Sequence, residues 1–209
     1  TPGSSFRGVH DSLVNHTRNH RPQIILVAHE EIAVAMAQGY CKATGRPAMA
    51  FLHDLVGVQH AAMAFYNAMA DRMPVIVLGG SGPADPAHRR KTDWIHSANT
   101  QCDIVKNVTK WTDEPSTLQA CLDSIARSQR IATSSPCSPT YVSVDVVLQE
   151  AKIPENIIPC TILILLISIL KLYHPSTPKK KNLTNRSSRP PTKWHKIVGE
   201  VHGGKGNLP

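Results

Sequence analysis

The sequence predicts an α/β fold in which helices cover both faces of a parallel sheet. Two observations favour this class. The first is a series of short apolar runs, bounded by Gly, Pro and polar residues, and the second is that longer segments of helical spacing alternate with these runs as far as about residue 150. Runs of this kind are typical of buried strands. Strands separated by helices of this length pair in parallel, and their right-handed crossovers place helices on both faces.

Four apolar runs are expected to form the strands. They are Ile24–Val27, Ala48–Leu52, Val75–Leu78 and Tyr141–Val144. The opening segment TPGSSF is typical of a loop that follows a strand, so we expect a first strand of the domain to be missing from the sequence.

The first expected helix follows Glu31. Ile32, Met36 and Tyr40 recur every four residues, which gives one apolar face. A Gly at position 45 and a Pro at position 47 predict the end of this helix.

Later segments complete the pattern. We expect helices at Val58–Asp71 and Ser116–Ser128. The segment Gly79–Asp93 is rich in Gly, Pro and charge, which predicts an exposed loop, and Asp93–Gln101 is expected to add a short helix.

The net charge of +8 is concentrated at one end of the chain. Residues 153–209 carry nine Lys or Arg and two Asp or Glu, whereas residues 1–152 are almost neutral. A nearly neutral globular part argues against a nucleic-acid-binding fold. We therefore expect one domain over residues 1–152 and a tail of different composition over residues 153–209.

The tail has two parts. Ile157–Leu170 is almost entirely apolar and is followed by a basic, Pro-rich stretch. The apolar run is shorter than the ~20 residues of a typical spanning helix, and Pro159 interrupts it. We favour a non-globular tail, either disordered or an artefact of the gene model. A membrane anchor is the alternative.

The five cysteines form no C-x-x-C pair and are odd in number. Reduced thiols in an intracellular compartment fit this pattern better than a disulfide framework or a structural zinc site. The first residues show no charged start followed by an apolar stretch, so we expect no secretory signal. We expect a cytoplasmic protein, with mitochondria as the alternative, although no targeting segment is seen.

Glu30 is the first candidate for a catalytic residue. It follows the expected strand Ile24–Val27, and the carboxyl ends of parallel strands are where ligands collect. A carboxyl walled by aliphatic side chains favours its neutral form, which can hold or pass a proton. The alternative is that Glu30 has no chemical role and only stabilises the first turn of a helix, where Glu is favourable. Glu31 fits that simpler role.

His53 follows the next expected strand and could face the same crevice as Glu30, or it could be an ordinary loop residue. Gly57 lies in a turn where a ligand could approach the backbone. His29, His53 and His60 could be imagined as metal ligands, but their spacing matches no standard zinc pattern, so we expect no metal site.

Three segments together resemble a known family. They are PGSSF, AHEEIAVAMAQGYCKATGRPA and FLHDLVGVQHAAMAFYNAMADRMPVIVLGG, in this order and spacing. They resemble the amino-terminal, pyrimidine-binding domain of thiamine diphosphate-dependent enzymes such as acetolactate synthase and benzoylformate decarboxylase. The resemblance covers Thr1–Lys152, and the block H-E-x(8)-G-Y-x-x-A-T-G is its most specific part. It implies a flavodoxin-like domain.

The resemblance also implies roles for individual residues. Glu30 matches the catalytic Glu that shares a proton with the aminopyrimidine ring of thiamine diphosphate, ahead of the attack on a 2-oxo acid. His53 matches a His that handles protons on the substrate, and Ser4 matches a Ser that contacts the substrate. Gly57 and His60 match positions beside the cofactor.

Two departures from the family leave questions open. The usual Gly-Pro-Gly turn reads Leu55-Val56-Gly57, and His60 replaces a common Asn, so the substrate and the reaction stay open. Nothing resembles the G-D-G…N motif that holds Mg²⁺ and the diphosphate.

The resemblance therefore implies a homodimer, or a partner subunit that supplies the second domain, and little activity in this chain alone. FAD is a further cofactor of some synthases. The alternatives are a subunit of a two-chain enzyme and a non-catalytic, membrane-tethered interaction protein.

Overall fold

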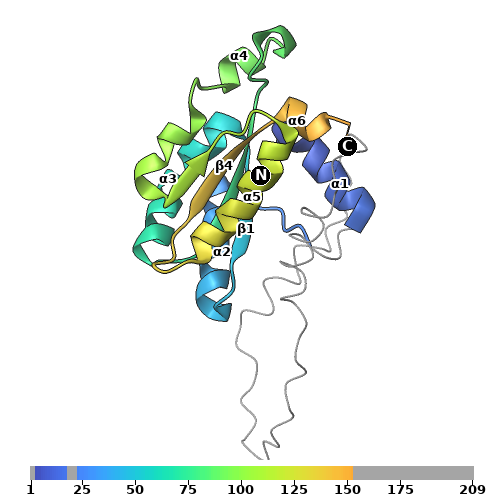
Figure 1. Ribbon diagram of the computed structural model, residues 1–209. Coiled ribbons are helices and arrows are strands. Elements are labelled where there is room, and N and C mark those ends of the chain that lie inside the picture. Colours follow the sequence, from blue (N-terminus) through green and yellow to red (C-terminus); the bar gives the residue numbers. More distant parts are fainter. Residues whose placement is uncertain (1–2, 18–22, 153–209) are drawn as a thin grey trace, which may run out of the picture. The chain divides into compact units, whose positions relative to one another are not determined.

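The computed structural model describes residues 3–17 and 23–152, and the expectations for residues 153–209 lie outside this part. Figure 1 shows its helices and strands. In chain order these are η1 Ser4–Phe6, α1 Arg7–Thr17, α2 Glu30–Thr44, β1 Ala48–Leu52, α3 Asp54–Ala70, β2 Val75–Ser81, η2 Pro86–His88, α4 Asp93–His96, η3 Gln101–Ile104, η4 Lys106–Val108, β3 Trp111–Asp113, α5 Leu118–Thr133, β4 Thr140–Asp145 and α6 Val146–Glu150, where η marks a 3₁₀ helix.

The four strands form one parallel sheet in the order β1-β2-β4-β3. In the register, Ala48 pairs with Val75, and Ile76 pairs with Thr140. Because all strands run the same way, their carboxyl ends share one edge of the sheet. The predicted α/β class with a parallel sheet is confirmed.

Helices cover both faces of the sheet, as predicted. Val77 of β2 belongs to an apolar cluster with Phe65 of α3 and residues of α2. The next residue, Leu78, belongs to a second cluster with Phe6 and with Cys121 of α5. Successive residues of a strand point to opposite faces, so β2 supplies side chains to two separate cores.

Helix α2 ends at Thr44, next to Gly45, where the sequence predicted its end. Gly45 adopts a left-handed conformation with φ 68°, and its amide donates to the carbonyl of Cys41 at 2.8 Å. Glycine enters this conformation without steric cost, which is why it commonly closes helices.

The predicted strand Ile24–Val27 is wrong. Residues 23–27 form no strand, and the side chains of Ile25 and Leu26 are 66% and 72% exposed. A short apolar run predicts a buried strand only if a neighbouring strand accepts its backbone hydrogen bonds. Among the described residues, β1 pairs with β2 alone. Ile24–Val27 therefore stays outside the sheet.

The other expected elements are present, most of them with shifted limits. Strand β1 has its predicted bounds, whereas α3 begins at Asp54 rather than Val58. The expected loop Gly79–Asp93 begins later than predicted, because β2 continues through Gly79 and Gly80 to Ser81. Helix α1 and strand β3 were not predicted.

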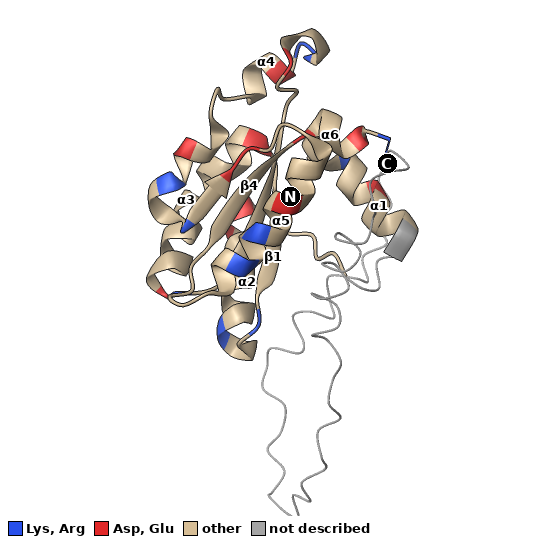
Figure 2. Cartoon of the chain, in the orientation of Figure 1, with Lys and Arg blue, Asp and Glu red and all other residues tan. Residues whose placement is uncertain are grey.

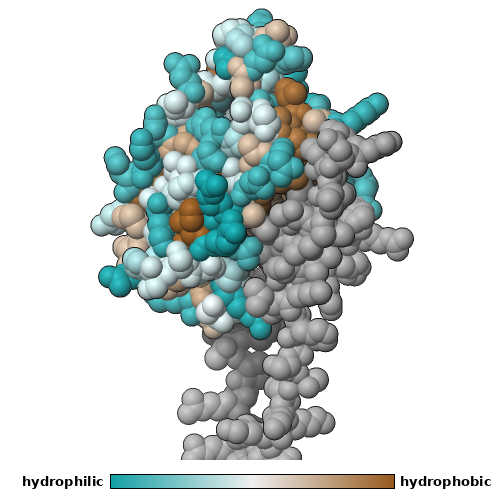
Figure 3. Space-filling model, viewed as in Figure 1, coloured by the Kyte–Doolittle hydropathy of each residue, from teal (hydrophilic) through white to brown (hydrophobic). Residues whose placement is uncertain are grey.

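The surface fits the near-neutral charge of residues 1–152. Acidic and basic side chains are interspersed over the described elements (Figure 2). On the face shown in Figure 3, strongly hydrophobic side chains form only small separate patches. Among the described residues, no helix has the length and apolar character needed to cross a membrane. Four cysteines are free thiols, and Cys160 lies outside the described part.

Candidate functional site

Glu30 is the first residue of helix α2, and its side chain is largely buried. His29 precedes it in an extended conformation (φ −146°, ψ 147°), and the Nδ1 atom of His29 accepts a hydrogen bond from the amide of Glu31 at 3.2 Å. Only 12% of the Glu30 side chain is exposed. The helix start favours a carboxylate there, whereas burial opposes its charge.

Two residues of helix α3 contact Glu30. The Nδ1 atom of His60 lies 3.2 Å from Oε2 of Glu30. A Cβ atom at position 57 would lie 3.2 Å from Cγ of Glu30, so Gly57 leaves room for this side chain. The structure thus brings together Glu30, Gly57 and His60, which are separated in sequence but were predicted to share a site.

His29 and His60 also meet. Their rings stack with centroids 4.9 Å apart and an interplanar angle of 19°. With Glu30 they form a group whose possible ligand atoms all lie within 4.8 Å of one another. This group differs from the three histidines considered from the sequence, because Glu30 takes the place of His53.

His53 lies between strand β1 and helix α3, with different neighbours. Its Nδ1 atom is 2.9 Å from Oγ of Ser5, and its Nε2 atom is 3.7 Å from Oδ2 of Asp54. The serine that contacts His53 is therefore Ser5, next to the predicted Ser4. The segment around Gly3 packs closely on this histidine, because a Cβ atom at Gly3 would collide with the imidazole ring.

The first turn of α3 connects the two groups. The carbonyl of His53 accepts a hydrogen bond from the amide of Gly57 at 2.6 Å. His53 therefore fixes the start of the helix whose next residues contact Glu30. His53 lies at the carboxyl end of β1, as the sequence predicted, whereas the strand that was predicted to precede Glu30 does not form.

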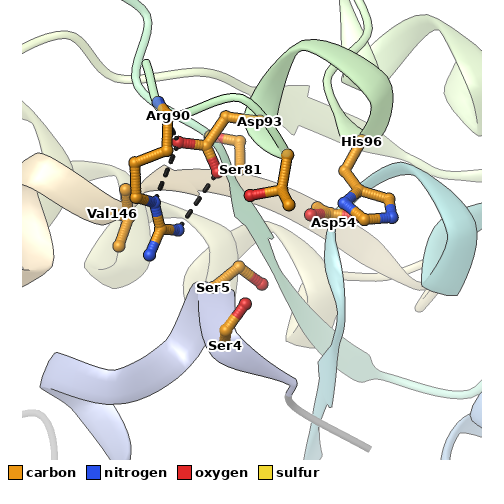
Figure 4. Close-up of a pocket in the computed structure, with 10 residues that line it drawn as sticks. Ser4, Ser5, Asp54, Ser81, Arg90, Asp93, His96 and Val146 are labelled. Carbon is orange, nitrogen blue, oxygen red and sulfur yellow. Dashed lines mark hydrogen bonds and ion pairs between the residues drawn. The ribbon is translucent and has the colours of Figure 1, made fainter. Parts of the chain in front are cut away.

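A polar cavity of about 120 Å³ is lined in part by Ser5 and Asp54, the two residues that lie beside His53. Figure 4 shows η1 contributing two serines opposite the paired Arg90 and Asp93, with Asp54 and His96 beside them. The lining residues are Ser4, Ser5, Asp54, Ser81, Gly82, Arg90, Thr92, Asp93, His96 and Val146. Hydroxyl groups, carboxylates, a guanidinium and an imidazole therefore line one small space.

The two carboxyl groups of this cavity differ in their electrostatics. Burial raises the pKa of Asp54 above its usual value, although His53 and His96 act in the opposite direction. Hydrogen bonds from Arg90 hold the pKa of Asp93 below its usual value. The Arg90 side chain reaches both carboxylate oxygens of Asp93 at 3.1 Å.

Asp54 is a functional candidate that the sequence did not single out. It is 4% exposed, and its Oδ1 atom has no hydrogen-bond partner among the described residues. An unpartnered buried oxygen is costly, so it marks a place where a ligand or water can bind. Its position directly after His53, at the end of a strand, was the available signal.

Comparison with known proteins identifies the family. Residues 3–106 match the model of the thiamine pyrophosphate enzyme, N-terminal TPP binding domain. Residues 3–106 of this chain belong to that family. All five residues predicted for the site lie within the matched range: Ser4, Glu30, His53, Gly57 and His60.

Curated relatives of this thiamine pyrophosphate enzyme domain are longer proteins. Benzoylformate decarboxylase of Pseudomonas aeruginosa is 32% identical over 127 residues, which are 57% of this chain and 22% of that protein. The mitochondrial acetolactate synthase catalytic subunit of Saccharomyces cerevisiae is 28% identical over 141 residues, which are 68% of this chain and 20% of that protein. The matched part thus spans roughly a fifth of each relative.

Solved structures of the family share the fold. A thiamin diphosphate-dependent enzyme from Mycobacterium smegmatis, described as putative, matches with a TM-score of 0.61 and 22% identity over 71% of this chain and 27% of that one. Benzoylformate decarboxylase from Polynucleobacter necessarius matches with a TM-score of 0.64 and 20% identity over 74% of this chain and 28% of that one. The described residues therefore have the fold of the family's N-terminal domain.

Proposed function

We propose that this chain holds the aminopyrimidine ring of thiamine diphosphate in an enzyme that decarboxylates or joins 2-oxo acids. The observation that carries the proposal is the position of Glu30 within the matched domain. Its side chain is 12% exposed and lies against His60 and Gly57 at the start of a helix. A carboxyl held in this way suits the exchange of a proton with a ring nitrogen.

The residues present fit this ring. His60 keeps 57% of its side chain exposed, so the Glu30–His60 pair borders solvent and a ligand can reach it. Gly57 has no side chain between Glu30 and the start of α3. When bound, thiamine diphosphate would supply the electron sink for decarboxylation or carboligation. Glu30 would hold the proton, and His60 would orient the Glu30 carboxyl.

The cavity beside His53 is the proposed place for the 2-oxo acid. Serine hydroxyls and the Arg90 guanidinium can donate hydrogen bonds to a carboxylate. His53 would accept or return a proton at the reacting carbon, and Ser5 would fix the orientation of its ring through the 2.9 Å contact. Ser4 lines the same cavity and would contact the substrate directly.

The diphosphate and Mg²⁺ would be held outside the described residues. We propose that a second domain, in a homodimer partner or in a separate subunit, supplies those ligands. The described residues alone would then bind the cofactor through its pyrimidine part and catalyse no turnover. Co-purification of the chain with a thiamine diphosphate-binding subunit would support the two-chain form.

Cofactor binding tests the proposal. Glu30→Gln should weaken binding of thiamine diphosphate to the full chain by about ten-fold or more, because one charge-assisted hydrogen bond is lost. Glu31→Gln is the matched control, since Glu31 is the exposed neighbour in the same helical turn. Equal binding by the two variants would contradict the role of Glu30.

A further inference from the structure

Two histidines and one glutamate meet at the start of helix α2. His29 and Glu30 come from the beginning of this helix, and His60 comes from α3. Their possible ligand atoms lie within 4.8 Å of one another. The sequence did not predict this group, because the carboxylate and the second helix become neighbours only in the fold.

We propose that His29, Glu30 and His60 bind a divalent transition-metal ion of the zinc class. Zinc accepts two imidazoles and one carboxylate and leaves a fourth position to water. Imidazole ligands favour zinc and its neighbours over magnesium, which prefers oxygen ligands and octahedral geometry. The proposed ion is therefore distinct from the Mg²⁺ that accompanies the diphosphate.

The geometry needs only a small rearrangement. Ligand atoms around a tetrahedral zinc ion lie about 3.3 Å apart, given bonds of about 2.0 Å. Oε2 of Glu30 and Nδ1 of His60 are already 3.2 Å apart. His29 must still approach them, and His60, which is 57% exposed, has room to adjust.

His29 would change its role on binding. Its Nδ1 atom accepts the capping hydrogen bond from Glu31, so coordination through either ring nitrogen replaces that bond. The positive end of the helix opposes a cation, whereas Glu30 and Glu31 in the first turn offset it. Binding of the ion would therefore leave the amide of Glu31 without its present acceptor, a cost that the metal–ligand bonds would have to offset.

A metal ion at this site would affect cofactor binding, if thiamine diphosphate binds at Glu30 as in the proposed function. An ion held by Glu30 and His60 would occupy the space beside the Glu30 carboxyl in which the aminopyrimidine ring is proposed to lie. The ion and the ring would exclude each other, so zinc would inhibit cofactor binding rather than assist it.

Metal titration of the full chain tests the site. Co²⁺ serves as the spectroscopic probe, because tetrahedral Co²⁺ absorbs in the visible range, and Zn²⁺ is measured by calorimetry. The chain has 11 histidines, so the decisive result is the effect of substitution rather than binding itself. His60→Ala and His29→Ala should each weaken binding by at least about ten-fold.

A matched control is available in η2. His88 is 62% exposed and pairs with Asp85 at 3.1 Å, but this pair has no third ligand beside it in the described chain. His88→Ala should therefore leave the affinity unchanged. His60→Asn, which keeps a polar side chain of similar size, repeats the test, with circular dichroism as the check of folding.

These measurements test the metal site separately from the exclusion of the aminopyrimidine ring. Equal affinity in wild type, His60→Ala and His60→Asn would overturn the metal site. Thiamine without diphosphate, which lacks the groups that chelate metals, tests the exclusion. Loss of binding in the His60 variants with no effect of thiamine would retain the metal site and overturn the exclusion of the ring.

Discussion

Gly57 and Glu30 face each other across the contact between helices α3 and α2, so closely that a Cβ atom on Gly57 would displace its neighbours by a few tenths of an ångström. A Cβ atom at position 57 would lie 3.2 Å from Cγ of Glu30 and 3.3 Å from the backbone carbon of Leu52. Gly57 therefore determines where the carboxyl of Glu30 can lie. This contact connects the strand–helix turn to the residue on which the proposed chemistry depends.

Gly57→Ala should impair the site more than the fold. Alanine in a helix is favoured over glycine by about 0.5–1 kcal/mol, but here the new methyl group presses on Glu30 and on the Leu52 backbone. We expect no gain in the free energy of unfolding and weaker binding of thiamine diphosphate. Thermal unfolding and calorimetric binding measure the two effects.

Gly39→Ala provides the control for that substitution. Gly39 also lies in a helix, and a Cβ atom there would meet nothing within 4 Å. The variant should gain about 0.5–1 kcal/mol in stability and keep the cofactor affinity of the wild type. A similar gain in Gly57→Ala, with unchanged affinity, would show that position 57 is not crowded.

Asp54→Asn should alter how stability depends on pH. The pKa of Asp54 is raised by burial, so at low pH both folded and unfolded states carry the proton and Asp54 contributes nothing. As pH rises past ~3.9, the unfolded state loses the proton first, and the free energy of unfolding falls. The variant lacks this loss. Its stability relative to wild type should therefore increase from pH ~3 to pH ~7.

Asp93→Asn should show the opposite trend, which makes it the control. The pKa of Asp93 is lowered by Arg90, so its ionised form stabilises the fold above the ordinary pKa and this stabilisation is lost in acid. Relative to wild type, Asp93→Asn should become less stable as pH rises. Urea unfolding at several pH values measures both trends, and parallel curves for the two variants would refute the assignments.

Thiol alkylation should follow burial. Burial raises the pKa of Cys121 to about 11 and raises the pKa of Cys102 further. The thiolate is the reactive form, so both should resist iodoacetamide at pH ~8 until the chain unfolds. Of the four described cysteines, Cys137 alone is partly exposed and should react first among them. Peptide mass spectrometry gives the order, and early labelling of Cys121 would contradict the described core.

The central elements of the fold could be predicted from sequence because their signals are local. Strand β1 is a continuous apolar run and was predicted with its observed bounds. Strand β3 was missed, because it has three residues and all of them are only half-buried. Ile24–Val27 was predicted as a strand, because its apolar pattern carries no information about whether a neighbouring strand exists.

The candidate site likewise contains residues that the sequence singled out and residues that it did not. His53 could be singled out by its position after strand β1. The strand expected before Glu30 does not form, so the family resemblance was the informative signal for Glu30, Gly57 and His60. The contact between Ser5 and His53 could not be predicted, since one residue of a turn decides which hydroxyl faces the histidine. Arg90 and His96 could not be predicted, because they reach the cavity from the segment after β2, whose path depends on tertiary packing.

The state of the pyrimidine ring tests the central claim most directly. Thiamine diphosphate labelled with ¹⁵N in that ring, bound to the full chain near neutral pH, reports by NMR whether the ring nitrogen facing Glu30 carries a proton. With the wild-type chain we expect the protonated signal, and with Glu30→Gln we expect the unprotonated signal at saturating cofactor. The same signal for bound cofactor in both proteins would contradict the claim that Glu30 holds this proton.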